Sequence, residues 1–329
     1  MAADPKLAHV AAELAAEAPL IACRFDPTGK YVFATAENRS IYRWELAGAK
    51  RIAFAAHDSW VFDLAITADG QTLISAGGDD QLIWWPAAAE TPQPIRQVKA
   101  HDGWIRALAL SADGKLLASG GNDRIVRLWN VADGTMIREF AAADRDIYSL
   151  VFHPSGQWLL AGDLDGKIHQ WNVADGMLIW TFDATPLHTY EGGQQVHYGG
   201  VRALVLSPDA KWVVGGGLHK GTNPLGNVQE PLALRFEWET AKMVRQHLTD
   251  GNPNERIWAM HYHPQGFVVA AIGGGKGALL FWNEGEDKPF HTFPLPNSAR
   301  GMAAHPDGLQ FATTHPDSKL RITKLAAKA

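Results

Sequence analysis

Short runs of alternating hydrophobic and polar residues recur along the chain, separated by turn sequences. The stretches HDSWVFDLAITADGQTLISAGGDDQLIWW (57–85) and HDGWIRALALSADGKLLASGGNDRIVRLW (101–129) repeat this pattern in nearly the same form. In each stretch an alternating run leads to an Asp-Gly turn, a second run follows, and a third run ends on tryptophan. A period of two is typical of strands with one buried face, so each stretch predicts three strands joined by tight turns.

The pattern occurs seven times, and each copy is marked by its first turn. The turns are FDPTGK at 25, ITADGQ at 66, LSADGK at 110, FHPSGQ at 152, LSPDAK at 206, YHPQGF at 262 and AHPDGL at 304. Proline presets one backbone dihedral and glycine accepts positive φ, which suits a tight reversal. The third strands end on Trp44, Trp85, Trp129, Trp171, Trp238 and Trp282, with Thr323 in that place in the seventh copy.

The spacing of these turns indicates the architecture. Four of the six intervals are 41 to 44 residues, and the two on either side of the fifth copy are 54 and 56. A period of about 40–45 residues with four short strands is typical of a propeller blade. One blade cannot cover its own apolar faces, so the copies must stack. Helical periodicity is absent from residue 20 onward, which disfavours a parallel α/β fold.

Two copies share a set of four residues that resembles the WD-repeat β-propeller family, and the resemblance covers nearly the whole chain. The family's structural tetrad is matched by His57, Ser75, Asp79 and Trp85, and again by His101, Ser119, Asp123 and Trp129. The resemblance implies an all-β fold, a seven-bladed β-propeller of four-stranded antiparallel blades. It also implies a ring closed by an N-terminal strand that pairs with the last blade. Residues 1–329 are then a single propeller, with 1–19 as closing strand and lead-in.

The tetrad is expected to be structural. A buried indole N–H needs an acceptor, and serine, histidine and aspartate can relay a hydrogen bond from it to the turn. A Ser-His-Asp catalytic triad is disfavoured because the chain would carry two copies of it. Asn38 and Lys276 replace the turn aspartate in the first and sixth copies, where weaker tetrads are expected.

The strand that completes the seventh blade must come from before the first copy. Residues 6–14, KLAHVAAEL, are the candidate. Their apolar positions also fit a short amphipathic helix. The strand is preferred because an open propeller would expose a sheet edge.

Three expansions surround the fifth copy: 183–200, 215–231 and 248–256. By the family's arrangement, the first two project from one blade on the face called the top. Long loops in compact domains are usually functional or disordered, and both readings remain open.

The family resemblance also places the residues beside the first strand of each blade around the top of the channel, where partners bind. In this chain they include Trp60, Phe62, Trp104, Arg106, Tyr148, Arg202, Arg256, Trp258 and Arg300. Aromatic residues and arginine are typical of interface hot spots. They predict a non-catalytic scaffold for a protein or peptide, including an acidic or phosphorylated one. The alternative is that the aromatics pack between blades and the arginines pair with nearby aspartates.

Histidines in the expansions raise a second reading. His188, His197 and His219 could form an open zinc-type site, but no ligand spacing such as HExxH supports it. We therefore expect no metal, no cofactor and no catalytic residue. The alternative function is a small-molecule- or metal-binding propeller, such as a hydrolase or lactonase-like enzyme, with its site under the blade-five loops and Arg202 and Glu191 nearby.

Composition narrows the remaining classes. The 329 residues are 46% hydrophobic and 20% charged, as in globular proteins, and the net charge of −5 gives no general reason to expect nucleic-acid binding. No apolar run approaches the roughly 18 residues that a membrane span needs, and the first residues do not resemble a secretory signal. The single cysteine excludes an internal disulfide framework. We expect a soluble, cytoplasmic, monomeric propeller within a larger complex, with no nucleic-acid or membrane partner.

Overall fold

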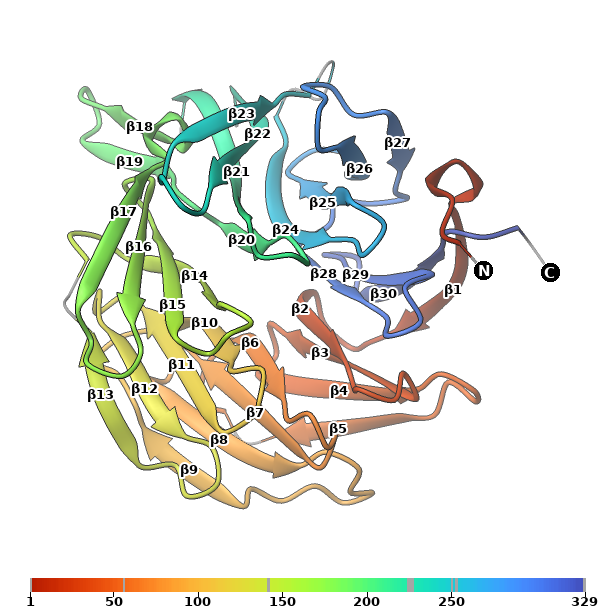
Figure 1. The fold of residues 1–329 in the computed structure, drawn as a ribbon. Helices are drawn as coiled ribbons and strands as arrows, with labels where there is room; N and C mark the ends of the chain where they lie inside the picture. The colour runs from red at the N-terminus through yellow and green to blue at the C-terminus, as the bar shows by residue number, and fades with distance from the viewer. Residues whose placement is uncertain are drawn as a thin grey trace. The chain divides into compact units, whose positions relative to one another are not determined.

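The computed structural model describes residues 2–55, 57–140, 143–223, 228–249, 251 and 254–327. Within them, seven four-stranded antiparallel sheets and one two-stranded hairpin make up the fold (Figure 1). In this described part of the chain, helix is limited to two 3₁₀ turns, η1 (Pro5–Leu7) and η2 (Thr185–Leu187). No helix among the described residues is long and apolar enough to span a bilayer.

Six sheets are formed by strands that are consecutive in the chain. The first comprises β2 (Leu20–Phe25), β3 (Tyr31–Ala36), β4 (Ser40–Glu45) and β5 (Arg51–Ala55). The second comprises β6 (Val61–Ile66), β7 (Thr72–Gly77), β8 (Gln81–Pro86) and β9 (Arg96–Lys99). The third comprises β10 (Ile105–Leu110), β11 (Leu116–Gly121), β12 (Val126–Asn130) and β13 (Met136–Phe140).

The next three sheets follow the same order. The fourth comprises β14 (Ile147–Phe152), β15 (Trp158–Asp163), β16 (Lys167–Asn172) and β17 (Leu178–Asp183). The fifth comprises β20 (Ala203–Leu206), β21 (Trp212–Asn223), β22 (Val228–Glu237) and β23 (Met243–His247). The sixth comprises β24 (Arg256–Tyr262), β25 (Phe267–Gly273), β26 (Ala278–Asn283) and β27 (His291–Pro294).

The seventh sheet joins the two ends of the chain. Its strands are β28 (Gly301–Ala304), β29 (Gln310–Thr314), β30 (Lys319–Lys324) and β1 (His9–Ala15), and β1 runs antiparallel beside β30 (Figure 1). The predicted propeller of seven four-stranded blades, with an N-terminal strand completing the last blade, is confirmed. The helical alternative for residues 6–14 is wrong. The strand begins at His9 because the segment before it, which contains Pro5, forms the turn η1.

The turn sequences explain where the chain reverses between the first two strands of a blade. Six of the seven predicted reversals place a glycine at positive φ, among them Gly29 at 72°, Gly70 at 68° and Gly114 at 70°. Side chains with a Cβ rarely adopt this conformation, so the glycine in the turn sequence fixes where β2 ends and β3 begins. The middle strands are buried on both faces, as the pattern of β3 shows, because neighbouring sheets cover them.

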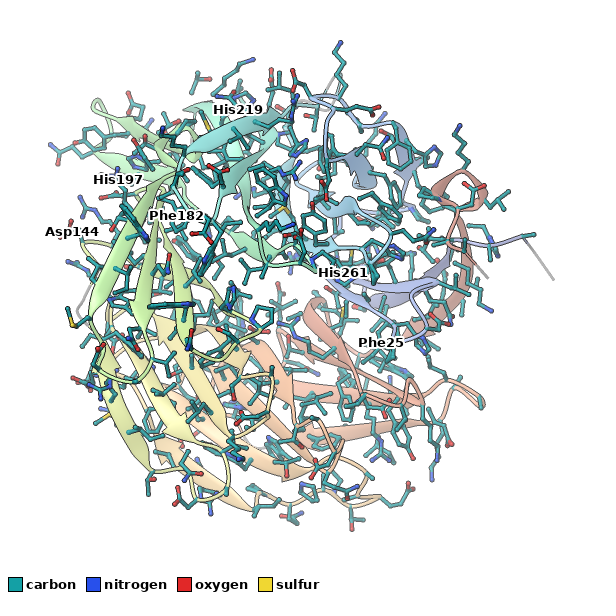
Figure 2. All side chains as sticks on the ribbon, viewed as in Figure 1. Phe25, Asp144, Phe182, His197, His219 and His261 are labelled. Atoms are coloured by element: carbon teal, nitrogen blue, oxygen red, sulfur yellow. The ribbon has the colours of Figure 1, made fainter. Side chains whose placement is uncertain are left out.

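The chain divides into two compact units. The first contains Met1–Asp123, Arg127–Arg138 and Arg300–Ala329, and the second contains Arg124–Val126 and Glu139–Ala299. Within each unit the hydrophobic core lies between neighbouring blades. In the second unit, Phe182 of the fourth blade packs edge-on against Phe236 of the fifth, with ring centroids 5.7 Å apart (Figure 2 labels Phe182).

Two of the expansions fold into strands. Residues 183–200 contain η2 and the hairpin of β18 (His188–Glu191) and β19 (Val196–Gly199). Residues 215–231, expected as a loop, instead lengthen β21 and β22, whose pairing continues to His219 and Glu230. Residues 224–227 of this expansion, and 250, 252 and 253 of the one at 248–256, lie outside the described residues.

Candidate functional site

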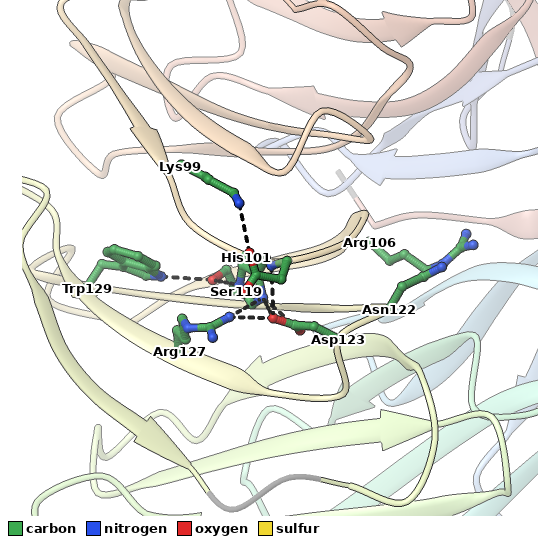
Figure 3. Close-up of polar contacts among 9 residues, drawn as sticks. Lys99, His101, Arg106, Ser119, Asn122, Asp123, Arg127 and Trp129 are labelled. Atoms are coloured by element: carbon green, nitrogen blue, oxygen red, sulfur yellow. Dashed lines mark hydrogen bonds and ion pairs between the residues drawn. The ribbon is translucent and has the colours of Figure 1, made fainter.

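Hydrogen bonds in the third blade connect the tetrad residues in series (Figure 3). The indole Nε1 of Trp129 donates to Ser119 Oγ at 2.8 Å, and that oxygen lies 2.6 Å from His101 Nε2. His101 Nδ1 lies 2.9 Å from Oδ1 of Asp123. The other oxygen of this carboxylate, Oδ2, forms an ion pair with Arg127 at 2.6 Å. The second blade repeats the series with Trp85, Ser75, His57 and Asp79.

The burial of these residues indicates what the series does. Ser75 and Ser119 are 0% exposed, so neither hydroxyl can reach a substrate. Each serine accepts from a buried indole and lies 2.6 Å from Nε2 of its histidine, with which it can share a second hydrogen bond. The series therefore satisfies buried polar groups and ties the third strand of each blade to the turn before it.

Blades without the full tetrad use other partners. In the first, Asn38 Nδ2 donates to the Tyr42 hydroxyl at 2.8 Å. In the sixth, the Trp282 indole donates to the carbonyl of Leu248 at 3.1 Å, and the backbone N–H of Lys276 donates to Glu255 at 2.5 Å.

An aromatic cluster forms in the first unit where β6 and β10 begin. Trp60 lies 6.4 Å from Phe62 between ring centroids, and Phe62 lies 5.4 Å from Trp104. The Arg106 guanidinium lies 5.3 Å from the Phe62 ring and 5.1 Å from that of Trp104, and its Nε donates to Asn122 Oδ1 at 2.5 Å. Trp60 and Trp104 are nevertheless 46% and 44% exposed.

Local sequence positions this cluster. Trp60 and Trp104 each directly precede the first strand of a blade, and their carbonyls accept backbone bonds from Gly78 and Asn122. A Cβ at Gly78 would lie 3.2 Å from Phe62 and 3.3 Å from Trp104. Glycine at this turn therefore leaves room for the two rings to approach. We use the name aromatic cluster for Trp60, Phe62, Trp104 and Arg106.

In the second unit, two arginines from the sequence analysis also stack on aromatic rings. The Arg202 guanidinium lies 3.7 Å from the Tyr148 ring centroid, and its Nε donates to the carbonyl of Gly199 at 2.8 Å. That of Arg256 lies 5.2 Å from the ring of Trp258. At these distances cation–π attraction holds both arginines against the blades.

Further contacts at these positions lie within the chain. With the side-chain amide of Gln229 oriented to accept, Arg256 donates to it through two nitrogens at 3.0 Å each. Burial lowers the pKa of Arg256 below its ordinary value. The Trp258 indole donates to the carbonyl of Gly273 at 3.2 Å. In the first unit, Arg300 forms an ion pair with Glu37. Gln229, Gly273 and Glu37 are thus partners within the chain. The five residues that contact each other or these partners, Tyr148, Arg202, Arg256, Trp258 and Arg300, are all partly buried.

Two of the three histidines considered as metal ligands meet in the β18–β19 hairpin. His188 Nε2 lies 2.9 Å from His197 Nδ1, and the two rings stack with centroids 5.1 Å apart. The third, His219, lies 3.3 Å from Glu230 on the neighbouring β21–β22 ladder and does not join them. Figure 2 labels His197 and His219 at their separate positions.

A carboxylate that was not among the residues predicted from the sequence lies beside these two histidines. Asp165 Oδ1 lies 3.6 Å from His188 Nε2 and 3.5 Å from His197 Nδ1, and Arg145 Nε lies 3.3 Å from both oxygens of the same carboxylate. Burial lowers the pKa of His188, which favours its neutral form. Asp165 is six residues before Trp171, the spacing that Asp79 and Asp123 have from their tryptophans, and this spacing was the available signal.

Comparison with known proteins supports the repeat assignment. The family described as "WD domain, G-beta repeat" matches residues 49–85, 92–130 and 134–172. No curated protein matches the chain in sequence. WD-repeat propellers serve in general as protein-interaction scaffolds. Three matched repeats together with seven four-stranded blades among the described residues are consistent with a WD-repeat β-propeller.

Proposed function

We propose that this protein is a non-catalytic scaffold that binds a protein or peptide through the aromatic cluster. The observation that carries the proposal is the exposure of Trp60 and Trp104, which are 46% and 44% accessible although both rings contact neighbours. Tryptophan and arginine are the residues that most often dominate binding energy at interfaces. A partner that covers this cluster would remove a large apolar area from water.

The charge of the cluster indicates the kind of segment that binds. Arg106 lies within about 5 Å of two ring centroids in a chain whose net charge is −5. A guanidinium stacked on aromatic rings is pre-organised to receive carboxylate or phosphate groups. We therefore propose an acidic or phosphorylated segment that places an apolar side chain against Trp60 and Trp104.

The proposal extends to the arginine–aromatic pairs of the second unit, Tyr148 with Arg202 and Arg256 with Trp258, as further contact residues. It also includes Arg300 of the first unit. Stacked pairs keep their geometry before a partner arrives, so binding orders fewer side chains. In this proposal residues 1–329 act as one module, monomeric within a larger cytoplasmic complex.

The test compares the double variant Trp60→Ala, Trp104→Ala with the wild-type chain in affinity capture from lysate of the native cell. Trp180→Ala is the matched control, because Trp180 is a tryptophan of β17 that is also 46% exposed. We expect proteins captured by the wild type and the control to be lost with the double variant, while its melting temperature stays close to that of the control.

A second arm addresses the acidic segment. Each captured protein is purified and titrated against the wild type and Arg106→Gln, before and after phosphatase treatment. If affinity falls both with Arg106→Gln and after phosphatase treatment, the segment is phosphorylated. If affinity falls with Arg106→Gln but not after phosphatase treatment, the segment binds through carboxylates. Capture that is the same for the wild type, the double variant and Trp180→Ala would refute the proposed function.

A further inference from the structure

Three potential metal ligands converge in the second unit. His188 Nε2, His197 Nδ1 and Asp165 Oδ1 form a triangle with sides of 2.9, 3.5 and 3.6 Å. The centre of such a triangle is about 2 Å from every corner, which is the length of zinc bonds to histidine nitrogen and carboxylate oxygen. The three atoms are thus placed at bonding distance from one common point.

The fold holds these side chains at that point. His188 pairs with Gly199 across the β18–β19 hairpin and Tyr190 pairs with His197, so His188 and His197 are diagonal neighbours on one face. The hairpin is fixed by Leu187, which is fully buried in the core between the fourth and fifth blades. Asp165 stands in the turn between β15 and β16 of the fourth blade.

The position of Asp165 in its blade explains why its carboxylate is available. By spacing from Trp171 it occupies the tetrad position of Asp79 and Asp123, but the corresponding histidine and serine positions hold Ala143 and Ala161. The Trp171 indole N–H is buried with no hydrogen-bond partner among the described residues. The fourth blade therefore lacks the tetrad, and its aspartate lies beside the histidines of the β18–β19 hairpin instead.

A hydrogen-bond network without metal is the competing explanation. Arg145 Nη2 lies 3.3 Å from His197 Nε2, so it can donate there and leave the single ring proton on Nδ1, directed at His188 or Asp165. A metal ion would take the place of that proton, with His197 in its other neutral tautomer. Arg145 is 38% exposed and can turn from His197 while holding the second carboxylate oxygen.

We propose that Asp165, His188 and His197 bind a divalent transition-metal ion, with zinc the best match. Two imidazole nitrogens and one carboxylate oxygen suit zinc better than calcium or magnesium, which prefer all-oxygen sites. Three protein ligands leave the fourth tetrahedral position for water or a partner's side chain. The site uses none of the residues of the aromatic cluster, so the metal-binding proposal and the proposed function can be tested independently.

The test is calorimetric titration of chelator-treated, dialysed protein with zinc chloride, and with cobalt(II) chloride followed by visible absorption. We expect one ion per chain and cobalt bands typical of low coordination number. Asp165→Asn, His188→Ala and His197→Ala should each weaken zinc binding by at least about tenfold, since even residues that only support ligands have effects of that size. His219→Ala is the matched control and should bind as the wild type does.

Folding is followed in the same samples by thermal unfolding. Zinc should raise the melting temperature of the wild type and His219→Ala but not that of the ligand variants, because an ion that binds only the folded state stabilises it. Wild-type protein that takes up no zinc at micromolar concentrations overturns the proposal. So does an equal loss of affinity in His219→Ala and His188→Ala, which would indicate scattered binding to surface histidines.

Discussion

Single residues decide whether a blade carries a hydrogen-bonded tetrad. In the third blade the Trp129 indole has a buried serine to accept its proton, whereas the indole of Trp171 in the fourth blade has no partner among the described residues. Both tryptophans are nearly fully buried at the end of a third strand. The fold tolerates the lost bond because the apolar area of the ring still packs between blades.

This pair gives a prediction with an internal control. Trp129→Phe removes an indole that donates a hydrogen bond, whereas Trp171→Phe makes the same change in volume and removes an unpaired buried N–H. We expect Trp129→Phe to destabilise the protein by about 1–2 kcal/mol more than Trp171→Phe. Urea unfolding with both midpoint and slope measured is the check. Equal losses would mean that the Ser119 bond contributes no net stability.

Side-chain partners at this scale were the least predictable from sequence. The repeats identify which residues precede each first strand, including Trp60 and Arg256. They do not show that Arg256 meets Gln229 or that Arg300 meets Glu37, because those contacts depend on how neighbouring turns and strands come together in the folded chain. Asp165 could not be identified as a neighbour of the histidines, because the sequence does not show that the inserted hairpin turns toward it.

At the scale of elements, the closing strand is held by charge as well as by backbone pairing. Glu13 of β1 forms ion pairs with Lys319 and Arg321 of β30, and Arg321 also pairs with Asp317. The Arg321 side chain is 3% exposed, so its charge needs these carboxylates. A strand pattern that is only partly apolar, as in HVAAELA, is therefore sufficient for β1 to complete the seventh sheet.

Hydrogen bonds from Lys319 and Arg321 lower the pKa of Glu13 below its ordinary value. A carboxyl whose pKa is lower in the folded than in the unfolded state contributes stability above its unfolded pKa, and this is lost as pH falls through the folded pKa. Glu13→Gln should cost about 0.5–1 kcal/mol at pH 7, since the side chain is partly exposed. The cost should shrink below pH 4.

Thermal unfolding of the wild type and Glu13→Gln between pH 7 and pH 3 measures this cost directly. Glu17→Gln is a suitable control, because Glu17 pairs with Arg51 of the first blade and not with β30. A difference between wild type and Glu13→Gln that stays constant down to pH 3 would show that Glu13 acts through packing and not through its charge.

At the scale of the whole molecule, the repeat was the most reliable sequence signal. Seven turn sequences predicted seven sheets because each blade is a complete strand-turn unit whose faces only another blade can cover. The expansions interrupt the regular spacing, so the repeat could not predict their structure. They became strands because β21 and β22 continue their pairing outward and because Leu187 and Val201 anchor the β18–β19 hairpin at both ends.

Because the seventh sheet combines strands from both ends of the chain, the fold should not depend on which loop of the ring contains the two termini. Asp4 N donates to the carbonyl of Leu325 at 2.8 Å, so the ends of the described chain are adjacent. A circular permutant with the ends joined by a short Gly-Ser linker and opened between Gly48 and Ala49 begins just before β5. Its sheets then contain the same strands, and β5 takes the closing role that β1 has in the native chain.

We expect this permutant to fold with a circular dichroism spectrum like that of the native chain, because residues 47–50 are exposed and a Cβ at Gly48 would contact nothing within 4 Å. A second permutant opened between Phe33 and Ala34, inside the buried strand β3, should fail to fold, since it divides a strand that both neighbours need. If both permutants fold or both fail to fold, strand pairing alone does not explain how closure by β1 stabilises the native chain. If only the first folds, stacking of complete blades is sufficient to specify this molecule.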